Sequence, residues 1–129
     1  MVKQVIDVDG YWEVIVFWNL DFGLFSFVEN EMRNLGMSEE GIEDVYQMMK
    51  SGKAKAVTCS NEVLHKSIVV FNRHENKIDY INSVVHEAEH IKQAMLRAYS
   101  VEDAGEDPAY TIGYLVGKMW KCWRRLGLS

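Results

Sequence analysis

The chain has 129 residues, a formal net charge of −5, and a composition that is 48% hydrophobic and 26% charged. This length suits one domain, and no repeat or linker divides the sequence, so we predict a single domain over residues 1–129. The acidic balance argues against a broad nucleic-acid-binding surface. The chain shows no signal peptide, no apolar run long enough to span a bilayer and only two distant cysteines. We therefore expect a soluble cytoplasmic protein that binds neither nucleic acid nor membranes.

Two pairs of short strands are predicted in the first half of the chain. Residues 2–8 and 11–19 are rich in Val, Ile and aromatic residues, and Asp9-Gly10 between them supplies the positive φ of a tight turn. This pattern is typical of a β-hairpin. Residues 55–60 and 65–72 are predicted to form two further strands, and residues 67–71 are a candidate edge for binding an extended substrate.

Two short helices are predicted between these strand pairs. Apolar residues repeat at helical spacing over residues 22–35, and Gly36 can end that helix. Ser38 can cap a second helix, which Gly52 ends.

The second half of the chain predicts two long helices. The first covers residues 78–99 and the second runs from about residue 106 to 125, with Pro108 tolerable only in its first turn. Gly113 and Gly117 are spaced so that the last helix can approach a neighbour closely. Strands and short helices followed by long helices predict the α+β class.

Residues 86–90 read His-Glu-Ala-Glu-His, the motif with the clearest chemical content. Positions i and i+4 of a helix lie one above the other, so His86 and His90 can bind one metal ion. Glu87 can then reach a water on that ion without being a ligand. Zinc lowers the pKa of such a water to about 7, and a neighbouring carboxylate can take its proton.

The same helix also has a plain alternative interpretation. An apolar stripe is formed by Ile81, Val84, Ala88, Ile91 and Met95, and the two histidines lie among polar residues on the opposite side. An ordinary amphipathic helix with two histidines on its solvent face would show this pattern. A third ligand decides between the two interpretations, because catalytic zinc usually has three protein ligands. Acidic residues follow at a suitable distance: Glu102, Asp103, Glu106 and Asp107.

The motif and the later segment resemble a known group of proteins. His-Glu-Ala-Glu-His, followed by the Gly-Glu-Asp-Pro-Ala-Tyr-Thr-Ile-Gly-Tyr of residues 105–114, resembles small zincin-like proteins of phages and bacterial genomes. The resemblance implies a zincin-like fold, with a small, mainly antiparallel sheet packed on the motif helix and a second C-terminal helix. It also implies one zinc ion per chain, with His86, His90 and Glu106 as ligands and Glu87 as general base. The short spacing from His90 leaves Asp107 or Asp103 possible as the third ligand.

These observations predict a zinc-dependent hydrolase, of the metallopeptidase type, that acts on a peptide or protein substrate. Tyr110 lies four residues after Glu106 and can donate to a developing oxyanion, although a buried core tyrosine is an equal alternative. A rival interpretation is a catalytically inactive, metal-stabilised zincin fold that serves as a binding or structural protein. His65 and His74 are predicted to be surface residues and Cys59 a small buried thiol.

Overall fold

The computed structural model describes residues 1–99 and 106–125, apart from the side chain of Glu106. Each predicted element is present, with bounds that differ from the prediction by a few residues, and the first predicted helix begins as a 3-10 turn (Phe22–Leu24). The elements are β1 (Val2–Val8), β2 (Trp12–Trp18), α1 (Phe25–Leu35), α2 (Glu39–Lys50), β3 (Ala56–Asn61), β4 (Lys66–Phe71), α3 (Lys77–Tyr99) and α4 (Glu106–Arg125).

Local signals explain where the elements begin and end. Asp9 and Gly10 both have positive φ, so the chain reverses sharply between β1 and β2. Gly36 ends α1 in the left-handed conformation, with a φ of 96°. The Ser38 hydroxyl caps α2 by accepting a hydrogen bond from the Gly41 amide at 3.0 Å. Pro108 lies in the first turn of α4, as predicted.

The four strands form one mixed sheet in the order β1-β2-β4-β3. The β1–β2 and β3–β4 pairs are antiparallel, whereas β2 and β4 are parallel. The α+β class and a mostly antiparallel sheet are therefore confirmed. Parallel neighbours need a long crossover, which α1, α2 and β3 provide. The prediction of a free edge at residues 67–71 is wrong, because those residues belong to a central strand and β3 is the edge.

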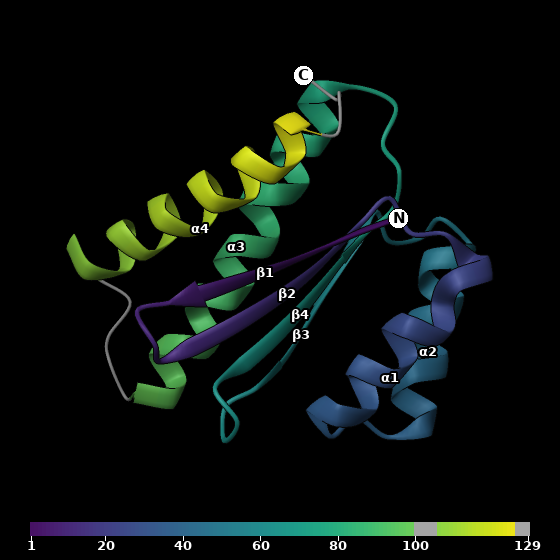
Figure 1. Ribbon diagram of the computed structural model, residues 1–129, viewed down its shortest axis with the longest axis horizontal. Coiled ribbons are helices and arrows are strands. Elements are labelled where there is room, and N and C mark those ends of the chain that lie inside the picture. Colours follow the sequence, from purple (N-terminus) through teal and green to yellow (C-terminus); the bar gives the residue numbers. More distant parts are fainter. Residues whose placement is uncertain (100–105, 126–129) are drawn as a thin grey trace.

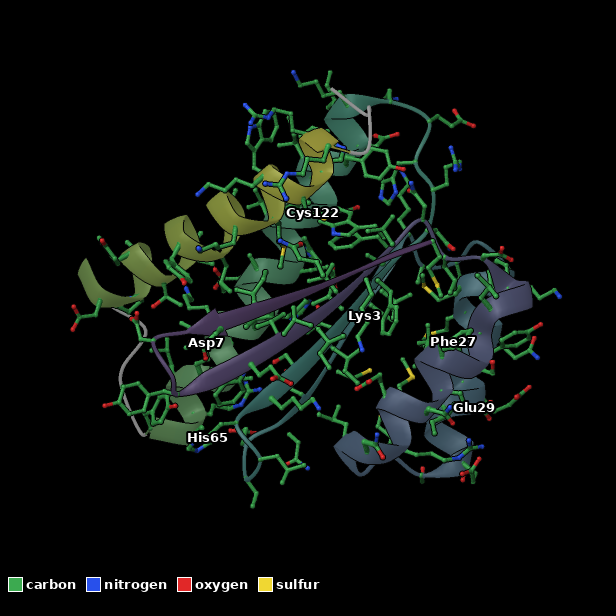
Figure 2. All side chains as sticks on the ribbon, viewed as in Figure 1. Lys3, Asp7, Phe27, Glu29, His65 and Cys122 are labelled. Atoms are coloured by element: carbon green, nitrogen blue, oxygen red, sulfur yellow. The ribbon has the colours of Figure 1, made fainter. Side chains whose placement is uncertain are left out.

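Helices cover both faces of the sheet, as Figure 1 shows: α3 and α4 lie on one side and α1 and α2 on the other. Side chains at alternate positions of the strands enter the two cores. Ile15, Ile68 and Val70 pack against α1 and α2, whereas the core under α3 and α4 contains Val14 and Val69. In Figure 2, Phe27 on α1 and Cys122 on α4 lie on opposite sides of the strands.

Helix α4 packs through apolar side chains rather than through its glycines. Leu115, Met119 and Trp123 are fully buried. A Cβ added at Gly113 or Gly117 would meet nothing within 4 Å, so the predicted close helix approach at these glycines is wrong. Among the helices of the described residues, none is long and apolar enough to cross a membrane.

Candidate functional site

The motif helix α3 buries one of its acidic residues. Glu87 lies three residues after Val84 and four before Ile91, so all three share the face that packs toward the sheet. Glu87 is 4% exposed, whereas Ile81, which was assigned to the apolar stripe, is 38% exposed. The buried face of α3 is therefore rotated toward Glu87 relative to the predicted apolar stripe. The Glu87 carboxylate lies on that buried face.

The two histidines of the motif converge. Nε2 of His90 lies 3.1 Å from Nε2 of His86, and both side chains are exposed. Two nitrogens bound to one zinc at about 2.0–2.1 Å in a tetrahedral arrangement lie roughly 3.3 Å apart. The observed separation therefore fits a pair of ligands to one ion. Without an ion, one ring must donate its N–H to the other.

Strand β3 fixes the position of the Glu87 carboxylate. The Thr58 hydroxyl donates a hydrogen bond of 2.9 Å to Oε1 of Glu87. The other oxygen, Oε2, lies 4.0 Å from Nε2 of His86. That distance is too long for a direct hydrogen bond, and one water molecule can bridge it. Thr58 was not identified from the sequence, and no local signal marked it, because β4 lies between β3 and α3 in the chain.

These groups open into a pocket between β3 and α3 with a volume of about 520 Å³. His86, Glu87 and His90 line one wall, and residues of β3 line the other. Charged side chains also line it: Lys55, Glu62 and Arg97, the last two forming an ion pair of 3.4 Å. The pocket therefore combines charged groups with apolar side chains and opens beside the edge strand.

Neither Tyr110 nor Asp107 lines this pocket. Tyr110 is 80% exposed and lines a separate hollow with Tyr114. Asp107 is exposed. Glu106 begins α4, but its side chain lies outside the described residues, as does all of Asp103. The assignment of Glu106 as a ligand therefore stays a prediction.

Helix α4 shares a face of the sheet with α3 but packs near the edge opposite to β3. The amide of Gln4 on β1 donates to the Lys118 carbonyl at 2.9 Å, and the Tyr114 hydroxyl donates to the Asp7 carbonyl at 2.9 Å. Both contacts place α4 over β1, and β1 and β3 are opposite edges of the sheet. The described residues that line the pocket come from α3, from β3 and its flanking turns and, through Met48, from α2.

Cys59 also lies on β3, next to Thr58. Burial, with a smaller effect from the negative charge of Glu87, raises the pKa of its thiol to about 11. The protonated thiol dominates at neutral pH and is a poor metal ligand. Cys59 is half-buried, so the predicted small buried thiol is confirmed only in part.

Comparisons of the chain with protein-family models, curated proteins and solved structures found no match. Within residues 1–99 and 106–125, no group of three or more His, Cys, Asp or Glu side chains is arranged to hold a metal ion. The expected membership of a family of small zincin-like proteins is therefore wrong. A His-x-x-x-His spacing arises on any helix that carries two histidines one turn apart, so the pentapeptide alone did not identify a family.

Proposed function

We propose that this protein is a metal-dependent hydrolase that cleaves a peptide bond, with His86 and His90 as metal ligands and Glu87 as general base. The observation that carries the proposal is the pair of imidazole nitrogens 3.1 Å apart, beside a buried carboxylate and open to a pocket. The proposal rests on these described residues and not on family membership.

Each side chain has a separate task in this proposal. Zinc, one ion per chain, would supply a bound water whose pKa is lowered to about 7. His86 and His90 would hold the ion through their ring nitrogens. Glu87 would act as the proton acceptor through Oε2, while the Thr58 hydroxyl keeps the carboxylate in place through Oε1.

The position of β3 supports an extended peptide as substrate. Within the sheet, β3 pairs with β4 on one side only, so its other backbone edge borders no further strand. An extended peptide can add to such an edge through main-chain hydrogen bonds. The same strand supplies Thr58 and Ser60 to the wall of the pocket, so a peptide on this edge would pass beside Glu87.

Glu87→Gln in the zinc-loaded protein tests the proposal, with Glu89→Gln as the matched control. Glu89 lies in the same motif but is half-buried and pairs with Lys92 at 2.8 Å. Cleavage of a peptide library should fall about 100-fold or more in Glu87→Gln, because general-base catalysis contributes roughly 10²–10⁴ in rate. Glu89→Gln should retain the rate. Cleavage that survives Glu87→Gln would remove Glu87 from the mechanism.

A metal-stabilised binding module is the second candidate. The observation that favours it is the lack of a third protein ligand among the described residues. Zinc should then raise the melting temperature of the wild-type protein, but not of the His86→Ala/His90→Ala double variant, without any peptide cleavage. Cleavage that depends on zinc and on Glu87 would decide for the hydrolase.

A further inference from the structure

A second chemically organised group lies in the connection between β4 and α3. Nε2 of His74 lies 2.7 Å from the Ser83 hydroxyl, and Nδ1 lies 2.6 Å from the Asn72 carbonyl. A carbonyl oxygen can only accept, so Nδ1 must carry the ring proton. The unprotonated Nε2 then accepts the hydrogen bond from Ser83, so the backbone fixes the tautomer in which His74 can act as a base.

The surroundings hold this histidine in place and favour its neutral form. The ring of His74 stacks on Tyr80, with 4.4 Å between centroids and 27° between planes. Burial is the largest cause that lowers the pKa of His74, and Lys55 acts in the same direction, against the Asn72 carbonyl and Asp79. The prediction of a surface residue is therefore wrong for His74, which is half-buried, hydrogen-bonded and neutral at pH 7.

Ser83 connects this group to the pocket described above. It lies one helical turn before Glu87 on α3 and lines the same pocket of about 520 Å³. Ser83 is half-buried. Its hydroxyl is hydrogen-bonded to His74, and the residue also lines the open pocket. Lys55 lines this pocket and also the neighbouring hollow that contains His74.

We propose that Ser83 and His74 form a nucleophilic pair that accepts an acyl group from an ester. An activated serine needs a base within about 2.6–3.2 Å and a third group that orients the base. Both conditions are met here, with the Asn72 carbonyl as the orienting group. The pair makes no use of His86, Glu87 or His90, so it is an activity separate from the metal-dependent one.

The reaction transfers the acyl group of the ester from its alcohol oxygen to Oγ of Ser83. Oγ of Ser83 forms a bond to the ester carbonyl carbon, and Nε2 of His74 takes the hydroxyl proton. The bond from that carbon to the leaving oxygen then breaks, and the departing alcohol receives the proton from His74. Lys55 lines the pocket, and its ammonium, which pairs with Asp79 at 3.6 Å, would supply positive charge for the intermediate oxyanion.

Incubation of the wild-type protein with 4-nitrophenyl acetate in the presence of a metal chelator tests the proposal. We expect release of nitrophenolate and one acetyl group on Ser83, mapped by mass spectrometry of a digest. Ser60 serves as an internal comparison, because it lines the same pocket but is hydrogen-bonded to Ser67 rather than to a histidine. The chelator keeps this result independent of the metal-dependent hydrolase.

Two controls make the outcome decisive. His74→Gln should slow acetylation about 100-fold, the size of a general-base contribution. His65→Asn should leave the rate unchanged, because His65 lies at the opposite end of β4 and asparagine tolerates its φ of 54° (Figure 2). Acetylation of the wild-type chain in urea tests the dependence on the fold without any variant. No acetyl group on Ser83, an equal rate in urea, or an equal rate in folded His74→Gln would overturn the proposal.

Discussion

The two faces of the sheet treat polar side chains differently. In the described part of the chain, the fully buried side chains between the sheet and α1 and α2 are apolar, and polar side chains such as Asn61 and Asn72 are only partly buried there. Among the described residues, the buried polar or charged side chains are Ser67, Glu87 and Lys92, and all three belong to the α3 side. Burial of a polar group is costly unless it is paired, so this difference needs an explanation.

Hydrogen bonds compensate the burial on the α3 side. The Ser67 hydroxyl accepts from the Trp12 indole N–H at 2.9 Å and lies 2.7 Å from the Ser60 hydroxyl. The carboxylate of Glu87 accepts from Thr58. The layer of α1 and α2 therefore contributes mainly to the core, whereas the layer of α3 and α4 also carries most of the pocket.

The largest expected effect is on the α1 and α2 side. Ile68→Ala removes a fully buried side chain of β4 and should lower the free energy of unfolding by about 2–5 kcal/mol, measured by urea denaturation. Peptide cleavage by the folded variant should persist, because Ile68 faces away from the pocket. Ile78→Ala is the control: Ile78 is 70% exposed and its replacement should cost less than about 0.5 kcal/mol. Loss of cleavage in folded Ile68→Ala would show that the pocket depends on the core beneath α1 and α2.

An intermediate effect is expected from the hydrogen bond that holds Glu87. Thr58→Val keeps the shape but removes the donor, and should cost about 1.5–3 kcal/mol, because the acceptor is a buried carboxylate. Thr111→Val is the matched control, since the Thr111 hydroxyl bonds to the exposed Asp107 carbonyl on α4. Equal urea midpoints for Thr58→Val and the wild type would show that this bond does not stabilise the α3 side.

A smaller, pH-dependent effect is expected at His74. Its pKa is lowered in the folded protein from an ordinary value of 6.5, mainly by burial, so the unfolded chain binds its proton more readily. The contribution of the neutral His74 to stability should therefore be fully present above pH 6.5. It should be lost as the pH falls through the lower folded-state pKa of this ring. The difference in melting temperature between about pH 7.5 and about pH 5.5 should shrink in His74→Gln. An unchanged difference would contradict the buried neutral ring.

The smallest effect is expected at Tyr110. Because this side chain is 80% exposed and away from the pocket, Tyr110→Phe should change stability by less than about 0.5 kcal/mol and leave peptide cleavage unchanged. Steady-state kinetics with the zinc-loaded protein provide the measurement. A fall of tenfold or more in kcat would return Tyr110 to the candidate site.

Local chemistry made the elements predictable. The Asp9-Gly10 turn, the Gly36 helix end and the Ser38 cap each depend on a few neighbouring residues, and each was identified from the sequence. The parallel pairing of β2 with β4 depends on residues about fifty positions apart in the chain, such as Glu13 and Lys66, and no local signal announces it. The position of β3 at the edge follows from that pairing and was missed for the same reason.

The candidate site was predictable only within one helix. The i, i+4 spacing placed His86 and His90 together, and the positions of Val84 and Ile91 already implied the burial of Glu87. The partner on β3 could not be read from the sequence, because Thr58 meets Glu87 only when strand and helix are packed. The resemblance failed because the pentapeptide and the short segment of residues 105–114 carry too little information to specify a family.

The parallel pairing of β2 with β4 has a consequence for how the chain folds. The two antiparallel hairpins join neighbouring segments of the chain. The parallel pairing of β2 with β4 joins segments about fifty residues apart, so it costs more loop-closure entropy. Contacts of this kind form late and slow the overall folding rate. Apart from Met48, the pocket-lining residues lie between positions 54 and 97, on one side of that pairing. The pocket is thus lined mostly by one continuous stretch of chain, whose internal contacts span fewer positions than the pairing of β2 with β4.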